Sequence, residues 1–303
     1  MFANLLELYP GSTITDFPPG NVGGSVHIFN NPLTGEWISI PADVISGREL
    51  DLLGRLYGKT EPITEKSPLL QLWRNFLLSG GELPSTHENE FVRLLQIQFY
   101  GQGNEREELE TAVKGFFPND VLILWENQRE AIIIQVGDTL LEERDIASMA
   151  AAFESDFYIK TLLYIGKKLR INADLPGHFG KERTLFSFAK KSMPREEYYT
   201  FEKIFPAYIA SQLPEQLAEA LLNEFQEAFS NDEEMFITVK GFLENGSNAS
   251  LTAKKLFIHR NTLQYRIDKF TDRTGVGLKD FHSAFTVYLA CLLYDKNRNS
   301  TTE

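Results

Sequence analysis

Residues 249–274, ASLTAKKLFIHRNTLQYRIDKFTDRT, constrain the fold of this chain more than any other stretch. They predict two helices, Ala249–Leu256 and Arg260–Thr274, joined by the short connection Phe257–His259. Two helices joined by so short a turn must cross closely, so a small side chain is needed where they meet. Ala253 stands at that position. The stretch therefore predicts a helix-turn-helix unit.

The second of these helices has two chemically different faces. Leu263, Ile267 and Phe270 follow one another at spacings i, i+4 and i+7, which places them on one apolar stripe. We expect this stripe to dock on the preceding helix, and we expect Gly275 to end the helix in a left-handed cap. The opposite face and its shoulders carry polar side chains: Asn261, Thr262, Gln264, Tyr265, Asp268, Lys269 and Asp272.

The connection between the two helices departs from the common pattern at its first position. Many helix-turn-helix units have glycine there, whereas this chain has Phe257. The ring of Phe257 could instead add to the core, beside Leu256 and Ile258, which we expect to fill the space between the helices. His259 follows directly and is expected near the N-cap of the second helix.

Charge is distributed unevenly along the chain. The whole sequence has a formal net charge of −12, but residues 247–275 carry six Lys and Arg against two Asp, a net of +4. A local basic surface on an acidic body indicates one dedicated binding surface for a polyanion.

This chemistry suits a helix that enters the major groove of DNA, because the N-terminal side chains of such a helix reach base edges. We predict base contacts from Asn261, Gln264 and Tyr265. The alternative to DNA binding is an ordinary amphipathic helix pair whose charged side chains form a solvated face. The predicted phosphate contacts are the basic residues Lys254, Lys255, Arg260, Arg266 and Lys269, with Thr262 and His259 as lesser contributors.

The stretch LFIHRNTLQYRIDKFTDRTG resembles the C-terminal helix-turn-helix of the PucR/CdaR group of bacterial transcriptional regulators, which includes purine-catabolism and sugar-diacid regulators. The apolar segment FHSAFTVYLACLL that follows also fits this group. The resemblance implies a sequence-specific DNA-binding regulator rather than an enzyme. The residues that carry it are Ala253, Leu256, His259, Arg260, Asn261, Thr262, Leu263, Tyr265, Arg266, Thr274 and Gly275.

Upstream, residues 88–192 predict the order β-α-β-β-α-β, with helices on one face of an antiparallel sheet. In the group that the chain resembles, a degenerate diguanylate-cyclase-like domain often precedes the DNA-binding end. An active cyclase has a Gly-Gly-(Asp/Glu)-Glu-Phe hairpin, whereas Glu126–Ala131 reads ENQREA and has no glycine. We therefore expect a domain that relays or dimerises and does not make cyclic dinucleotides.

These patterns predict an α+β chain of several domains. We expect a small N-terminal α/β domain of unknown role at 1–84, a degenerate cyclase-like sandwich at 85–204, and an all-α domain at 205–303 with its helix-turn-helix at 249–274. The N-terminal domain should contain two strands and two helices, one at Leu50–Tyr57 and one that starts at Ser67-Pro68 and ends at Gly80-Gly81. The two strands are Ser25–Phe29 and Glu36–Ile40. Capping-box patterns predict the start of one helix at Ser46–Glu49 and, in the all-α domain, the start of another at Ser230–Glu233.

Composition excludes several other classes of protein. Cys291 is the single cysteine, so a disulfide scaffold is excluded and a buried thiol is expected. His27, His87 and His178 lack metal-ligand spacing. We therefore predict no metal, cofactor or catalytic residue. The N-terminus does not resemble a secretion signal, and no window approaches about 18 apolar residues, which predicts a cytoplasmic protein that does not span a membrane.

Partners follow from the size of the predicted interface. One recognition helix buries too little surface for tight specific binding, so a homodimer or higher homo-oligomer on a two-fold DNA site is expected. A small-molecule effector is a further candidate partner. Two rival functions stay open: an enzyme related to nucleotide cyclases that acts through residues 88–192, and a sensor or scaffold whose helix-turn-helix binds protein.

Overall fold

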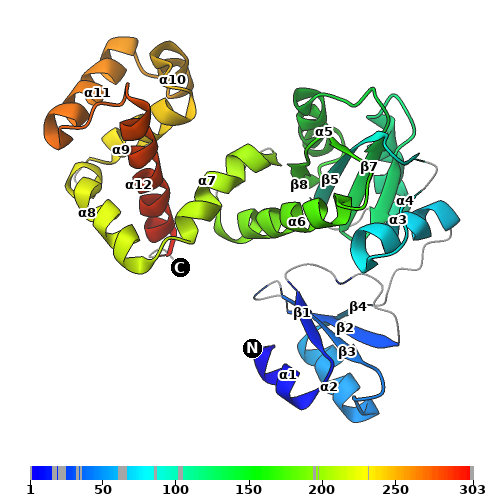
Figure 1. Cartoon of the computed structure of the whole chain (residues 1–303). Coiled ribbons are helices and arrows are strands. Elements are labelled where there is room, and N and C mark those ends of the chain that lie inside the picture. The colour runs from blue at the N-terminus through cyan, green and yellow to red at the C-terminus, as the bar shows by residue number, and fades with distance from the viewer. Residues whose placement is uncertain are drawn as a thin grey trace. The chain divides into compact units, whose positions relative to one another are not determined.

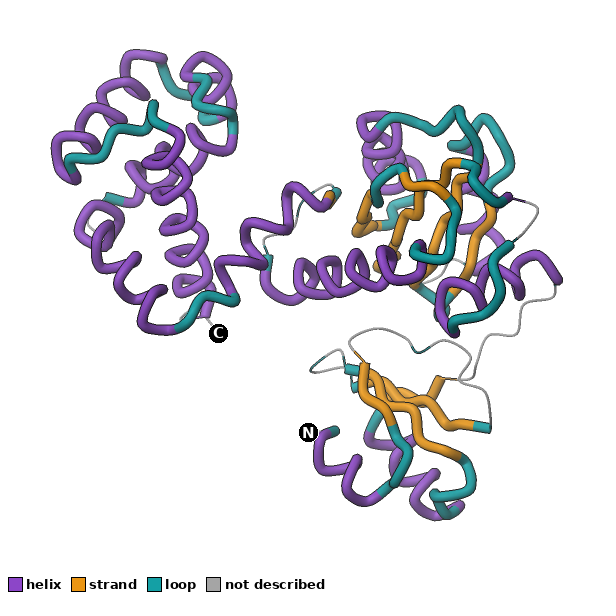
Figure 2. Tube along the Cα trace, in the orientation of Figure 1, coloured by secondary structure: helices purple, strands orange, loops and turns teal. Residues whose placement is uncertain are grey.

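The computed structural model (Figure 1) describes residues 2–15, 19, 25–31, 34, 36–60, 67–84, 87–101, 105–193, 196, 198–230 and 232–300. The chain divides into two compact units, Met1–Phe201 and Glu202–Glu303, which we call the N-terminal unit and the helical unit. All strands among the described residues belong to the N-terminal unit, and the described part of the helical unit consists of helices and their connections (Figure 2). This confirms the predicted α+β class with an N-terminal sheet, a central sheet and a helical C-terminal region.

The N-terminal unit begins with a small antiparallel sheet and two helices. The strand order is β1-β3-β2-β4, and β2 and β3 confirm the two strands predicted there. The capping box also forms, because the Ser46 hydroxyl accepts from the backbone N–H of Glu49 and the Glu49 carboxylate accepts from the backbone N–H of Ser46. The elements are α1 (Ala3–Leu8), β1 (Thr13–Thr15), β2 (Val26–Asn30), β3 (Trp37–Pro41), α2 (Gly47–Leu56) and β4 (Gly58–Thr60).

A larger central sheet follows in the same unit. Its strand order is β10-β8-β5-β7-β6, with β9 also pairing with β5, and every pair is antiparallel except β10 with β8. The succession β5-α4-β6-β7-α5-β8 confirms the predicted order. The elements are α3 (Pro68–Ser79), β5 (Phe91–Tyr100), α4 (Arg106–Gly115), β6 (Leu122–Trp125), β7 (Glu130–Val136), α5 (Glu143–Asp156), β8 (Lys160–Ile165), β9 (Leu169–Arg170), α6 (Leu175–Ser192) and β10 (Tyr199–Thr200).

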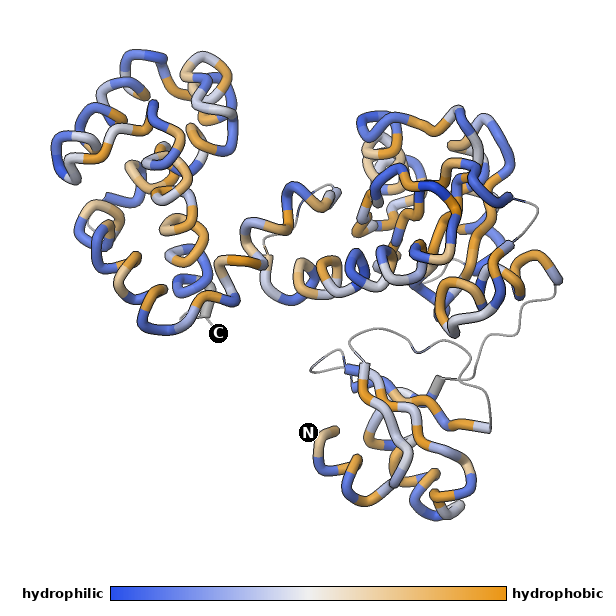
Figure 3. The backbone as a smooth tube through the Cα atoms, viewed as in Figure 1, coloured by the Kyte–Doolittle hydropathy of each residue, from blue (hydrophilic) through white to orange (hydrophobic). Residues whose placement is uncertain are grey.

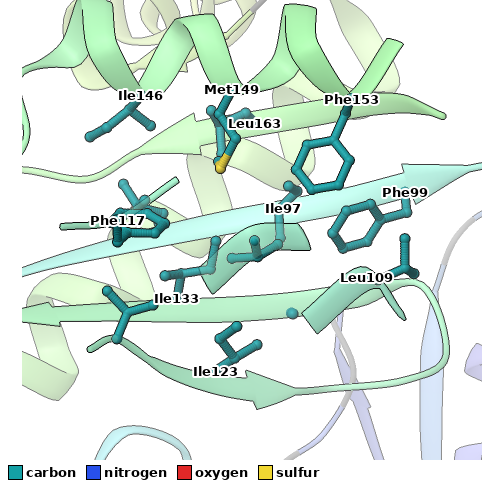
Figure 4. Close-up of a cluster of buried hydrophobic side chains, with 14 of the residues drawn as sticks. Ile97, Phe99, Leu109, Phe117, Ile123, Ile133, Ile146, Met149, Phe153 and Leu163 are labelled. Carbon is teal, nitrogen blue, oxygen red and sulfur yellow. The ribbon is translucent and has the colours of Figure 1, made fainter. Parts of the chain in front are cut away.

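Helices cover both faces of the central sheet. On one face, Met149 and Phe153 of α5 point onto Ile97 and Phe99 of β5, in a core that α4 also joins (Figure 4). On the opposite face, α3 and α6 pack on the sheet, and Trp73 of α3 is fully buried there. We expected helices on one face only, and that part of the prediction is wrong. The reason is that β5 has buried side chains on both faces, so both need a cover.

The hairpin between β6 and β7 is tied to α6 by two ion pairs. Arg183 Nη2 lies 2.5 Å from Glu126 Oε1, and the two side chains are 4% and 8% exposed. Lys190 Nζ lies 2.8 Å from Glu130 Oε1 in a half-buried pair. The Asn127 carboxamide closes the turn, since its oxygen accepts from the backbone N–H of Glu130 at 2.9 Å. The hairpin therefore ends in a buried charge pair instead of an open loop.

The helical unit is a bundle whose fourth and fifth helices form the helix-turn-helix. A capping box at Ser230 was predicted, and it is wrong because α8 runs through Ser230, whose hydroxyl donates to the carbonyl of Gln226. Asp232 is the N-cap of α9 instead, and its carboxylate accepts from the backbone N–H of Met235 at 3.0 Å. The helices are α7 (Phe201–Ser211), α8 (Glu215–Ser230), α9 (Glu233–Glu244), α10 (Ala249–Lys255), α11 (Arg260–Thr274) and α12 (Phe281–Ser300).

An aromatic core holds this bundle together. Hydrophobic and hydrophilic residues alternate along α8 (Figure 3), which turns its apolar side toward α9, α11 and α12.

Cys291 of α12 is fully buried, which confirms the expected structural thiol, and burial raises the pKa of that thiol. No helix within the described residues is long and apolar enough to cross a membrane.

Candidate nucleic-acid interface

Helix α11 is anchored by the apolar stripe that its sequence predicts. Leu263, Ile267 and Phe270 are 0%, 7% and 0% exposed. The Phe270 ring stacks on those of Phe225 and Phe229 of α8, with centroid distances of 6.2 and 6.0 Å. Aromatic pairs at these separations add to the free energy gained from burial. The stripe therefore fixes which face of α11 remains available to a ligand.

Small residues let α10 approach its neighbours, as the helix-turn-helix interpretation requires. Ala253 of α10 is 5% exposed and packs in the core of the unit. Gly241 of α9 lies opposite, where an added Cβ would be 3.8 Å from side-chain atoms of both Leu256 and Thr252. Leu256 thus lies beside α9, and Ile258 packs against the same core. That both residues fill the space between α10 and α11 stays a prediction.

The turn between α10 and α11 is closed by backbone hydrogen bonds. The N–H of Phe257 donates to the carbonyl of Lys254, and the N–H of Ile258 donates to that of Ala253. This is a Schellman motif, whose left-handed residue is normally glycine. Here Phe257 takes that conformation, with a φ of 53°, and its side chain is 95% exposed. The expectation that the ring could add to the core is wrong, because Ile258 takes the inward position.

Both ends of α11 are capped. His259 is the N-cap, and its Nδ1 accepts from the backbone N–H of Asn261 at 3.2 Å. Gly275 ends the helix with a φ of 70°, and its N–H donates to the carbonyl of Thr271. These contacts confirm both predicted ends and set the start of the helix at Arg260.

The N-terminal half of α11 has an exposed polar face. Tyr265 is 65% exposed, and the Gln264 carboxamide donates to the Asp268 carboxylate at 2.8 Å along the same face. The structure therefore brings all three predicted base contacts to one side of the unit. The predicted site residues that are exposed on α11 or its N-cap are His259, Arg260, Asn261, Thr262, Gln264 and Tyr265.

The predicted phosphate contacts fall into two groups. Lys254, Lys255 and Arg260 lie at the end of α10 and the start of α11, are exposed, and form no ion pair within the described part of the chain. Arg266 and Lys269 are half-buried and face the start of α9. The basic surface available to a polyanion is therefore concentrated around the N-terminus of α11.

Two carboxylates at the start of α9 explain why some of the predicted phosphate contacts are exposed and others are paired. The sequence did not reveal these pairings. Glu234 pairs with Arg266, whose guanidinium also donates to the Thr238 hydroxyl at 3.2 Å. Asp232 lies 2.8 Å from the ammonium of Lys269. The hydrogen bond from Lys269 lowers the pKa of Asp232, so the carboxylate stays ionised. Acidic residues suit a helix N-terminus, which was the one signal in the sequence for this cluster.

This geometry defines a helix-turn-helix of the kind that transcriptional regulators carry. Residues 236–293, from α9 to α12, match the family model described as the PucR C-terminal helix-turn-helix domain. The chain belongs to the PucR/CdaR type of bacterial transcriptional regulators and is a transcriptional regulator with a helix-turn-helix.

Similar proteins extend the likeness beyond this domain. The uncharacterized protein YxkF of Bacillus subtilis (strain 168) is 34% identical over 293 residues, 95% of this chain and 97% of that protein. The carbohydrate diacid regulator of Escherichia coli (strain K12) is 26% identical over 114 residues, 37% of this chain and 30% of that protein. The purine catabolism regulatory protein of Bacillus subtilis (strain 168) is 35% identical over 69 residues, 23% of this chain and 13% of that protein. Likeness to proteins named as regulators thus covers less of the chain than likeness to YxkF.

Proposed function

We propose that the N-terminal half of α11 enters the major groove of duplex DNA and reads its sequence there. One observation carries the proposal: α11 buries its apolar stripe and leaves a polar half exposed beside cations that have no carboxylate partner among the described residues. The carboxamides of Asn261 and Gln264 can each bind adenine through two hydrogen bonds. The Tyr265 hydroxyl supplies a third polar contact to base edges.

The phosphate contacts would come first from the cations around the start of α11. Lys254, Lys255 and Arg260 are available for them, with His259 and Thr262 as lesser contributors. Arg266 and Lys269 stay in the proposal as secondary contacts, because they would have to leave the carboxylates of α9 to reach a phosphate. Orientation on the duplex thus depends on cations that need no rearrangement.

In this proposal the rest of the chain supports DNA binding through dimerisation and through sensing or relaying a signal. We propose a homodimer on a two-fold site, since one recognition helix buries too little surface alone. In this proposal, residues 1–84 and 85–204 sense or relay a signal, such as a small-molecule effector, in the cytoplasm, and residues 205–303 bind DNA. A non-enzymatic role for 85–204 is supported by the hairpin, where the Glu126 carboxylate is buried against Arg183 and is not available to bind a metal-nucleotide complex.

Asn261→Ala should weaken binding to the cognate site by about 1–3 kcal/mol and relax base preference at one position. The loss is expected because the alanine leaves the paired base edge without its hydrogen bonds. Fluorescence anisotropy with a duplex from the chain's own promoter region, against a scrambled duplex, measures both effects. Asn223→Ala, at an exposed position of α8, is the matched control and should change neither. An equal loss on the two duplexes would contradict the base contact.

Lys255→Ala should weaken binding to every sequence and reduce the slope of log K against log[salt] by about one, because one phosphate contact and its released counterion are lost. Titrations at several salt concentrations measure the slope. Lys114→Ala removes the same charge from α4 in the other unit, so it should leave the slope unchanged. A wild-type chain with no salt-dependent affinity for its promoter region would contradict the proposed function itself.

A further inference from the structure

Phe257 combines two unfavourable features at one residue. Its backbone is left-handed, with a φ of 53°, a conformation that residues with a Cβ avoid. Its ring is 95% exposed to water. Glycine would relieve the backbone at the Schellman position and would remove the exposed ring. Because Phe257 is almost fully exposed against the described residues, packing within the unit gives no reason for the ring, and a strained exposed residue suggests a role in binding.

The position of Phe257 indicates where that role lies. The residue lies in the turn between Lys255 and Arg260, two exposed cations that the proposed function places on phosphates. It also precedes the N-cap His259 by two residues, so it belongs to the end of α11 that approaches the groove. A side chain that lies between two phosphate contacts at this end of α11 would enter the same groove and approach its base edges.

We infer that Phe257 contacts the 5-methyl group of a thymine in the major groove, an inference that rests on the proposed function. The base edges in that groove present donors and acceptors, and the thymine methyl is their one apolar group. An exposed aromatic ring gains free energy when it leaves water to pack on such an apolar group. Phe257 therefore selects thymine at one position of each half-site, beside the position that Asn261 reads by hydrogen bonds.

Deoxyuridine substitution tests this contact, because it removes the methyl group and keeps the base pairing of thymine. The bound site is first located by footprinting the full chain on its own promoter region, and each thymine is then replaced singly. For the wild type we expect about a fourfold loss of affinity at one thymine per half-site, the value of one buried methyl group. Phe257→Gly should bind more weakly and show no loss at any deoxyuridine position.

Two controls separate this effect from folding. Phe257→Gly should raise the Tm of the chain, so its weaker binding does not come from unfolding. Tyr158→Gly is the matched variant: Tyr158 is 90% exposed with a φ of 55°, but it lies in the N-terminal unit, and its replacement should leave DNA affinity unchanged.

The outcomes distinguish a failure of the Phe257–thymine contact from a failure of the proposed DNA binding. Full affinity of Phe257→Gly overturns the DNA contact and favours a protein partner for the ring. Weaker binding of Phe257→Gly without any deoxyuridine effect in the wild type overturns the thymine assignment. In both cases a loss specific to Asn261→Ala leaves the proposed function standing, whereas a wild type that binds no duplex removes both.

Discussion

Replacing Phe270 with alanine should lower the free energy of unfolding of the helical unit by about 3–5 kcal/mol. The Phe270 side chain is fully buried and stacks on Phe225 and Phe229, so it connects α11 to α8. Alanine would leave a cavity whose aromatic walls cannot collapse without moving the recognition helix. A loss of this size is a large part of the stability of an ordinary domain.

The tryptophans allow this effect to be assigned to one unit. The chain has three, Trp37, Trp73 and Trp125, and all lie in the N-terminal unit. Tryptophan fluorescence during urea unfolding therefore reports that unit, while far-UV circular dichroism reports both. Phe270→Ala should shift the transition seen by dichroism and leave the fluorescence transition in place.

Phe285→Ala is the matched control for this change. It removes the same atoms from α12, but Phe285 is 50% exposed, so the loss should be well below that of Phe270→Ala. Equal losses from the two variants would show that Phe270 does not anchor α11 as described. A shift in the fluorescence transition would show instead that the two units unfold together.

Local patterns in the sequence predicted much of the site. The stripe Leu263, Ile267 and Phe270 is buried as its spacing requires, and His259 and Gly275 cap α11. Such features depend on residues within about two helical turns of one another, where helical geometry alone fixes the neighbours. The order β-α-β-β-α-β was also predictable, since each element has its own periodicity.

Features that depend on contacts distant in sequence were not predictable. Lys255 and Lys269 are the same residue type in the same basic stretch of sequence. Lys255 is exposed, whereas Lys269 pairs with Asp232 at the start of α9. The cover of α3 and α6 over the second face of the central sheet also depends on tertiary packing. Phe257 is a different case: a left-handed phenylalanine violates local preference, and its apolar ring had suggested an addition to the core.

Arg183→Met should destabilise the N-terminal unit by about 3–5 kcal/mol, because it leaves the Glu126 carboxylate buried without its partner. The pair is 2.5 Å long and almost fully removed from water. Tryptophan fluorescence during urea unfolding reads the loss directly. A control at the half-buried pair, Lys190→Met, leaves Glu130 with more solvent and should cost less.

The stability lost in Arg183→Met should increase as the pH rises. Burial raises the pKa of Glu126, and Arg183 is the first of the groups that oppose the shift. A carboxyl whose folded pKa lies above its unfolded value stabilises the fold below the unfolded pKa and loses that contribution as pH rises through the folded pKa. Arg183→Met removes the opposing charge, so its loss relative to the wild type should be larger near pH 8 than near pH 5. The double variant Arg183→Met, Glu126→Leu should recover most of the stability and lose this pH dependence, since the carboxyl whose pKa is raised is then absent. A double variant as unstable as Arg183→Met would show that packing of the arginine, rather than its charge, holds the hairpin to α6.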